Sequence, residues 1–324
     1  MKNLQNQSIR NRKGELRSVG GVVSLVRTKN PEDIRSSISE ALTLIGFKLD
    51  NAVKSVVIKP NLCYYWDSST GNTTDPRIVA AVIDLVREGH ANVEIKVAEA
   101  DASAMKTKHV FSVLGYEKLA KDKDVELVNL SIDVLEERTV KVGRREIQFK
   151  IPQLLVKSDL FVSVPKLKVM RATKITCAMK NIFGCIGAPR KIVYHPFLNE
   201  AIVGINKILH PHLTIVDGII ALGRYPLRLD LIMAATDPFS ADWVACQTMG
   251  YNPARVEFLK IAIKEKVGSS KGITTKGESP AEFKKIFPRP GLTSSNQMWS
   301  LQSWLLKAYR KMSGDIIPPG LEEA

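Results

Sequence analysis

Apolar runs rich in β-branched residues alternate with amphipathic stretches through the first half of the chain. The runs have the composition of buried strands and lie at 22–26, 53–60, 93–99 and 125–130. Stretches with a helical spacing of apolar residues separate them, at 31–46, 76–88 and 108–121. This strand–helix rhythm predicts an α/β fold with a largely parallel sheet that is flanked by helices.

The pattern changes at 139–151, where apolar and polar residues alternate about Gly143. Such alternation around a glycine is typical of a β-hairpin, so we expect a hairpin insertion near 139–151 at a sheet edge. The strand–helix rhythm then returns. Further strands are expected at 159–165, 213–219 and 231–237, and further helices at 173–184, 197–209, 241–250 and 253–266.

The C-terminal part of the chain has a different pattern. Residues 287–297 are rich in proline and serine, as linkers are. Residues 298–312 then place Trp304, Leu305 and Tyr309 at helical spacing with basic residues opposite, which predicts an amphipathic C-terminal helix. Its apolar face has three alternative partners: the chain's own α/β body, a second copy in a homo-oligomer, or a membrane surface.

Three parts follow from these patterns: a basic flexible N-terminus at 1–18, an α/β domain at 19–286, and the linker with its helix at 287–324. The composition, 44% apolar and 25% charged, is that of a globular protein. No apolar run reaches the roughly 18 residues of a membrane span, and no secretory signal is recognised. We therefore expect a cytoplasmic protein.

The cysteines support the same expectation. They are scattered, without a CxxC pair, at Cys63, Cys177, Cys185 and Cys246. Isolated cysteines in a cytoplasmic protein are usually reduced thiols, and this spacing matches no common cluster motif. We expect no iron–sulfur cluster in this chain.

Charge adds a functional indication. The chain has 47 basic and 33 acidic residues, for a net charge of +14. Basic residues concentrate at 1–18 and 282–312, and above all at 164–191, which contains no acidic residue. Because a basic surface raises the local concentration of anions, three kinds of partner remain open: nucleic acid, an acidic membrane surface, or a phosphorylated metabolite as a small anionic ligand.

Polar residues follow several predicted strands. They include Lys59, Asn61, Glu99, Asp101, Lys166, Lys168, Asp217 and Asp237. The carboxyl ends of parallel strands meet at one edge of the sheet, where α/β proteins bind ligands. We therefore expect the lysines of this set to hold a small carboxylated or phosphorylated metabolite.

Lys180 and Asn181 lie within the apolar stretch ITCAMKNIFGCIG. A lysine in such surroundings either extends to water or meets an anion. If Lys180 is buried, desolvation lowers its pKa and suits it to proton transfer or Schiff-base chemistry. Lys191 belongs to the same basic segment, and His195 beside it is the candidate general acid or base.

Three aspartates, Asp217, Asp237 and Asp242, are candidate ligands for a divalent cation such as Mg²⁺, which prefers carboxylates shared with a phosphorylated ligand. The alternative for Asp237 is a helix cap, since Pro238 and a predicted helix follow it. Sequence motifs of several enzyme classes are missing: GxxxxGK[ST], GxGxxG after a strand, HExxH and GxSxG.

Several segments together resemble a known family, domain of unknown function 362, over about residues 53–267. They are IKPNL (58–62), TDP (74–76), VPKLK (164–168), TKITCAMKNIFGCIG (173–187), His195, IVDGI (215–219) and TDPFSADWVACQTMGY (236–251). The resemblance implies a shared α/β domain with a polar site, but it supplies no reaction. The implied site residues are Lys59, Asn61, Lys166, Lys168, Lys180, Asn181, His195, Asp217, Asp237 and Asp242.

The chain departs from that family in two ways. Members are often joined to a ferredoxin-type iron–sulfur module, whereas this chain has no clustered cysteines after Cys246. Met170 stands where the family often has a histidine.

We expect an enzyme or enzyme-like protein that binds a small anionic metabolite. The alternatives are a basic module for nucleic acid or an acidic partner, and a redox accessory that works with a separate ferredoxin-like protein.

Overall fold

The computed structural model describes residues 9–10, 16–17, 21–63, 65–90, 92–102, 105–188 and 190–289. The predicted C-terminal helix at 298–312 lies outside these residues, as does most of the basic segment 1–18. Two short strands of that segment, β1 (Ile9–Arg10) and β2 (Leu16–Arg17), pair antiparallel with each other.

A central sheet organises the described residues. Its order is β14-β3-β13-β12-β9-β4-β5-β6, and β10 joins the sheet beside β12 and carries β11. The strands are β3 (Val22–Arg27), β4 (Ser55–Pro60), β5 (Glu94–Glu99), β6 (Glu126–Asn129), β9 (Leu160–Val164), β10 (Lys166–Met170), β11 (Lys174–Thr176), β12 (Leu213–Leu222), β13 (Pro226–Ala235) and β14 (Thr274–Gly277).

Most neighbouring strands of this sheet are parallel. The run β12-β9-β4-β5-β6 is parallel throughout, and β14 is parallel to β3. Strand β13 runs antiparallel to both of its neighbours, β12 and β3. The predicted α/β fold with a largely parallel sheet is confirmed, with β13 and the short β11 as reversed strands.

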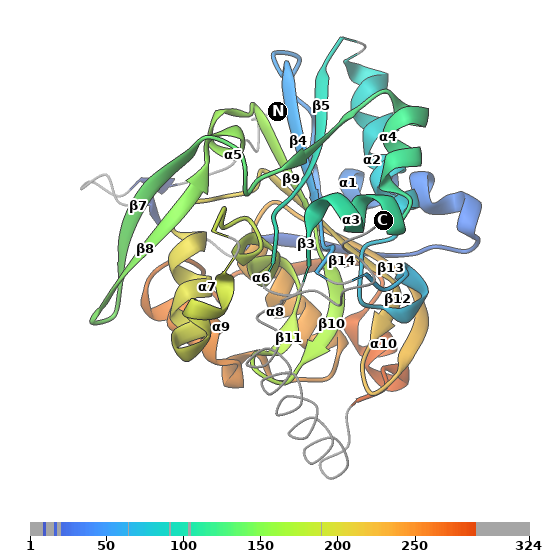
Figure 1. Cartoon of the computed structure of the whole chain (residues 1–324). Coiled ribbons are helices and arrows are strands. Elements are labelled where there is room, and N and C mark those ends of the chain that lie inside the picture. The colour runs from blue at the N-terminus through green and yellow to red at the C-terminus, as the bar shows by residue number, and fades with distance from the viewer. Residues whose placement is uncertain are drawn as a thin grey trace, which may run out of the picture.

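Helices cover both faces of the sheet (Figure 1). One face packs against α1 (Ile34–Ile45), α2 (Pro76–Gly89), α3 (Thr107–Val113) and α4 (Tyr116–Lys123). The other packs against α6 (Ala178–Phe183), α7 (Leu198–Asn206), α8 (Pro238–Thr248) and α9 (Glu257–Lys264). Because side chains alternate along a strand, Val56 and Ile58 of β4 belong to the first core and Val57 to the second. Two further α-helices of the described residues are α5 (Gln153–Lys157) and α10 (Pro280–Ile286).

The predicted hairpin is confirmed, but it does not extend an edge of the central sheet, as was expected. Strands β7 (Leu135–Val142) and β8 (Arg145–Pro152) pair antiparallel around Gly143, whose φ of +59° suits glycine. They form a two-stranded sheet of their own that projects from the body (Figure 1). The apolar face of β8, with Phe149, packs against α7.

Two predicted helices differ from the structure. The stretch 108–121 is divided into α3 and α4 at Gly115, which has a φ of +75°. The stretch 173–184 begins as strand β11, because β-branched Ile175 and Thr176 pair with β10, and only Ala178–Phe183 is helical. Among the described residues, no helix is long and apolar enough to cross a membrane.

Candidate functional site

Lys59, at the end of β4, forms a buried ion pair. Its Nζ lies 2.7 Å from Oε1 of Glu99, the last residue of β5, and both side chains are almost completely buried. The same ammonium group donates to the Pro60 carbonyl (2.8 Å) and to Oδ1 of Asn181 (3.3 Å). The charge of Lys59 is therefore neutralised within the protein, and this lysine is not free to pair with a ligand.

Asn181, on α6, connects that helix to two strands. Its Nδ2 donates to the Lys59 carbonyl (3.2 Å) and to Oγ of Ser163 in β9 (3.0 Å). Its Oδ1 also accepts from Nδ2 of Asn61 (3.4 Å). The predicted residues Lys59, Asn61 and Asn181 thus lie together, and Asn181 holds α6 over the sheet edge.

Lys166 forms a second buried ion pair. The register of β10 on β12 sets Lys166 opposite Asp217, and Nζ lies 2.8 Å from Oδ2 of the aspartate. The aspartate also accepts from the backbone N–H groups of Asp75 (2.8 Å) and Ile219 (3.1 Å). Asp75 caps α2, so this pair ties the sheet to the start of that helix.

Lys168 differs from Lys59 and Lys166 in its polar partners. It is 3% exposed, yet among the described residues its Nζ has two polar contacts, with Sγ of Cys63 (2.9 Å) and the carbonyl oxygen of Asn72 (2.6 Å). No carboxylate of the described residues pairs with it. Thr176 lies directly opposite Lys168 in the β10–β11 register, so both side chains are on the same face. The Thr176 hydroxyl is buried and has no hydrogen-bond partner among the described residues.

Lys180 and His195 complete this group. Lys180 is partly exposed and forms no ion pair within the described residues, and its Nζ lies 5.9 Å from the centre of the Phe183 ring. Burial chiefly, together with the charge of Lys168 and against the opposite influence of Cys63, lowers the pKa of Lys180 to about 8. Partial burial and the Lys180 charge lower the pKa of His195, so its imidazole is mostly neutral at pH 7. The charge of Lys180 thus interacts with Cys63, Lys168 and His195.

Lys191 lies apart from that group. It is buried and donates to the carbonyl oxygen of Asp101, which follows β5. Burial is the main cause that lowers the pKa of Lys191 to about 8, against the attraction of Glu99 and with the repulsion of Lys59. Lys191 therefore neighbours the Lys59–Glu99 pair.

The three aspartates predicted as metal ligands are not brought together. Asp237 follows β13, and because that strand is reversed, Asp237 lies at the opposite edge of the sheet, where it caps α8 through the N–H groups of Phe239 and Ser240. Asp242 accepts from the N–H groups at the start of α6, and Asp217 pairs with Lys166. Within the described residues, no group of three His, Cys, Asp or Glu side chains could hold a metal ion.

Sequence reasoning missed three members of the site: Cys63, Asn72 and Thr176. One signal was available, because Cys63 follows the strand end that carries Lys59 and Asn61. The other two were not recognisable, since Asn72 contributes a backbone carbonyl and Thr176 was assigned to a helix. Thr176 instead lies on strand β11, directly opposite Lys168, and this position brings it into the site.

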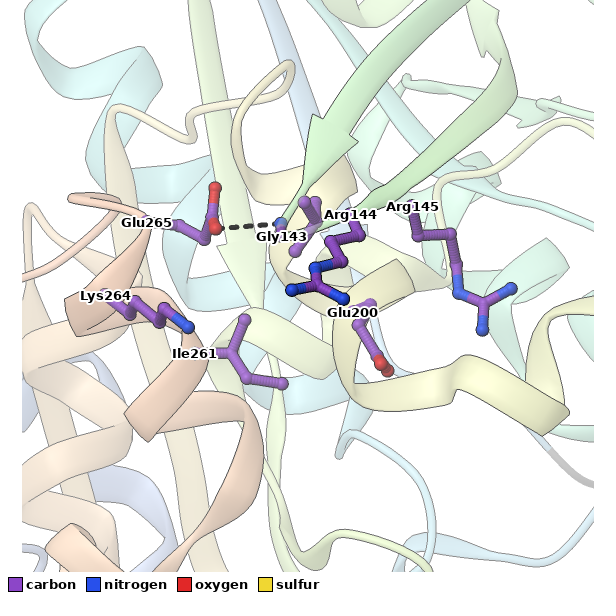
Figure 2. A pocket seen from close by; sticks show the side chains of 8 residues that line it. Gly143, Arg144, Arg145, Glu200, Ile261, Lys264 and Glu265 are labelled. Carbon is purple, nitrogen blue, oxygen red and sulfur yellow. Dashed lines mark hydrogen bonds between the residues drawn. The ribbon is translucent and has the colours of Figure 1, made fainter.

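Two cavities lie away from this cluster. The larger, about 450 Å³, lies between the tip of the β7–β8 hairpin, α7 and α9 (Figure 2). It is lined by Val142, Gly143, Arg144, Arg145, Glu200, Ile261, Lys264 and Glu265. Its charges have both signs, and Glu265 already pairs with Lys207 (2.5 Å) and accepts from Gly143 N. Arg145 points away from the other side chains and lies over the Phe197 ring.

The smaller cavity, about 140 Å³, is at the other edge of the sheet, beside the starts of β4 and β5. Neither cavity has the buried, unpaired cations of the Lys168 group. The unpaired buried lysine therefore favours the strand-end cluster as the candidate site, and Cys63 and Lys180 are its partly exposed members.

The chain is similar to known proteins in sequence. The sequence profile of a family described as "Domain of unknown function (DUF362)" matches residues 56–247, which include the two buried ion pairs and the Lys168 group. A thylakoid-associated protein of Synechocystis sp. is 29% identical over 273 residues, which are 76% of this chain and 79% of that protein.

Among solved structures, one similar chain is the lactate racemase apoprotein from Thermoanaerobacterium thermosaccharolyticum. Its sequence identity is 14% and its TM-score is 0.38. The match covers 71% of this chain and 57% of that one, so this chain spans little more than half of its length. A similarity of this size carries no functional argument.

Proposed function

The chain belongs to the domain of unknown function 362 family, whose description assigns no reaction, so we propose a function from the site itself. The protein binds a small carboxylated or phosphorylated metabolite at the carboxyl edge of its parallel strands. Lys168, Lys180 and the Thr176 hydroxyl contact the acid group of the ligand.

The buried ammonium group of Lys168 carries this proposal. An isolated buried charge is costly unless an opposite charge or several hydrogen bonds compensate it. Lys59 and Lys166 have carboxylate partners, whereas Lys168 has a thiol and one carbonyl. A bound anion would supply the missing charge, and the unpartnered Thr176 hydroxyl beside Lys168 would donate to the same anion.

The burial of the Lys168 ammonium group favours a small ligand over nucleic acid. With 3% of Lys168 exposed, its ammonium group cannot reach the backbone of a duplex or of an extended strand. Nucleic-acid contacts need basic side chains that project from the surface toward phosphates. A compact carboxylate or phosphate that enters beside Lys180 meets both lysines.

His195 gives the site the means for proton transfer. Its lowered pKa leaves the imidazole free to accept a proton at neutral pH, and the charge of Lys180 contributes to that lowering. We therefore infer an enzyme-like site in which the lysines bind the anion and His195 acts as a base.

Titration calorimetry with oxalate and with inorganic phosphate tests the binding. We expect the wild type to bind at least one of these anions, and both Lys168→Gln and Lys180→Gln to weaken that binding about tenfold or more, as the loss of a charge-assisted hydrogen bond would. Lys121→Gln is the matched control, because Lys121 is an exposed lysine of α4. Equal affinities in all four proteins, or no binding by the wild type, would contradict the proposal.

A further inference from the structure

Cys63 lies within the same cluster but has no part in the binding described above. It follows β4 by three residues, and its Sγ is 2.9 Å from Nζ of Lys168. Its side chain is partly exposed, and its other polar contacts, with Asn61 Oδ1 and the Asn72 carbonyl, are long. A thiol in direct contact with an ammonium group is an arrangement found in nucleophilic cysteines.

The other cysteines are in different environments. Cys177, Cys185 and Cys246 are completely buried. Burial is the main cause that raises the pKa of Cys185 to about 12 and the pKa values of Cys177 and Cys246 well above their ordinary range. Buried thiols of this kind are inert. The chain therefore has one accessible thiol, and it lies at the strand-end cluster.

A second observation points to a ligand beside this thiol. The Thr176 hydroxyl, 3% exposed by residue and without a partner among the described residues, is on the same face of the β10–β11 pair as Lys168. The ammonium group of Lys180 also forms no ion pair there. Both groups can bind the acid group of a ligand whose remaining atoms would reach the sulfur.

We propose that Cys63 is the nucleophile of the site and that it adds reversibly to the carbonyl carbon of a small aldehyde or 2-oxo acid. In this step, which rests on the proposed anion site, the S–H bond of Cys63 breaks and a bond forms between Sγ and the carbonyl carbon. The π pair of the carbonyl moves to its oxygen, which takes a proton from the Lys180 ammonium group, and the proton released by the sulfur returns to the Lys180 amine. The product is a hemithioacetal or hemithioketal beside a restored ammonium group, and no oxidant or reductant is needed.

The first test compares two alkylating reagents that differ in charge. Iodoacetate and iodoacetamide each form a bond between sulfur and carbon with loss of iodide, but only iodoacetate carries a carboxylate. The ratio of their rates at Cys63, measured by mass spectrometry of peptides, is referred to the ratio for glutathione at the same pH. We expect the wild type to favour iodoacetate at least several-fold more than glutathione does.

Variants separate the contributions of Cys63 and of the two lysines to the labelling rates. Cys63→Ser should remove the rapid labelling, and Lys180→Gln should return the rate ratio toward that of glutathione. Lys168→Gln should do the same, but this buried lysine also supports the fold, so the partly exposed Lys180 gives the decisive comparison. Lys121→Gln should leave the ratio unchanged. Equal ratios for the wild type and glutathione, or rapid labelling at Cys177, Cys185 or Cys246, would overturn the assignment.

The second test addresses the carbonyl. Glyoxylate and glycolate have the same charge and nearly the same size, but only glyoxylate has an aldehyde. We expect glyoxylate to protect Cys63 from iodoacetamide at concentrations at least tenfold lower than glycolate requires. Equal protection would mean that the site binds the acid group without addition to the sulfur. If oxalate binding depends on Lys168 and Lys180 while these results are negative, the proposed function stands and the nucleophile assignment fails.

Discussion

At the scale of single residues, the partner of each buried lysine determines what that lysine can do. Lys59 and Lys166 pair with Glu99 and Asp217, so they stabilise the junctions between strands and helices. Lys168 occupies a similar position at the strand ends but has a thiol as its nearest side-chain neighbour. A buried lysine can pair with an acidic ligand only if no acidic side chain of the protein already neutralises its charge.

The protonation state of Lys180 should control anion binding. Burial is the main cause that lowers its pKa to about 8, so the free protein loses this charge as the pH rises through 8. Oxalate remains a dianion over the same interval, and we therefore expect its affinity to fall above about pH 8. Calorimetric titrations of oxalate between pH 6.5 and 9.5, at intervals of about half a unit, would measure this.

The Lys180→Gln variant is the control for that experiment. Its affinity for oxalate should be lower than that of the wild type at neutral pH and should change little across the interval. Lys191 has a pKa of about 8 as well, but it lies beside Asp101 and Glu99. A pH dependence that persists in Lys180→Gln would assign the effect to another group.

At the scale of elements, helix α6 depends on its surroundings for its position. Six residues form too short a helix to be stable alone. Asp242 of α8 accepts hydrogen bonds from the N–H groups of Ala178 (2.7 Å) and Met179 (3.0 Å). Asn206 of α7 donates to the Met179 carbonyl (2.9 Å). The position of Lys180 is thus fixed by side chains of two other helices.

Asp242 should make the stability of the protein depend on pH. Burial, opposed by the two N–H donors, raises its pKa from an ordinary value of 3.8 to about 7. Between these values the folded chain binds one more proton than the unfolded chain, so the free energy of unfolding falls as the pH rises. Asp242→Asn remains neutral throughout. Urea unfolding of both proteins at pH 5 and pH 8 should show the wild type losing on the order of 1–3 kcal/mol relative to the variant.

Comparison with the variant isolates Asp242 from other titrating groups. Burial lowers the pKa values of His195, His210 and His212, which changes stability in the opposite direction but in both proteins alike. A constant difference between wild type and variant from pH 5 to pH 8 would show that Asp242 does not titrate in this interval.

The sequence predicted the positions of the helices and strands better than it predicted the directions of the strands in the sheet. The spacing of apolar residues was sufficient for the strand–helix order and for the hairpin about Gly143, because both depend on local patterns. The reversal of β13 depends on its pairing with β12 and β3, which no local pattern encodes, and it moved Asp237 to the other edge. Likewise, the lysines were correctly expected near strand ends, but their carboxylate partners come from distant segments.

At the scale of the whole molecule, two apolar cores lie on opposite faces of one sheet, and the buried charges lie where the strands end. Ile215 and Val162 belong to the core under α1 and α2, whereas Phe161 and Val216 belong to the core under α6 to α8. Lys59 faces the α6 side through Asn181, and Asp217 faces the start of α2 through Asp75. Each ion pair therefore fastens one helical layer to the sheet.

The Lys166–Asp217 pair should show strong coupling between its members. Removing either partner leaves the other as an unpaired buried charge, at a cost of about 3–5 kcal/mol, so Lys166→Met and Asp217→Asn should each destabilise the fold by that order. The double variant buries no charge at this position. The N–H groups of Asp75 and Ile219 bond to different oxygens of Asp217, so the amide that Asp217→Asn introduces keeps an acceptor for one of them.

We expect the double variant to be less destabilised than the sum of the single variants, by more than about 1 kcal/mol in urea unfolding. The exposed pair Lys118–Asp122 of α4 is the matched control, because its members are largely in water and its coupling should be close to zero. If the effects at Lys166 and Asp217 were simply additive, the pair would not hold the sheet to α2 through its charges.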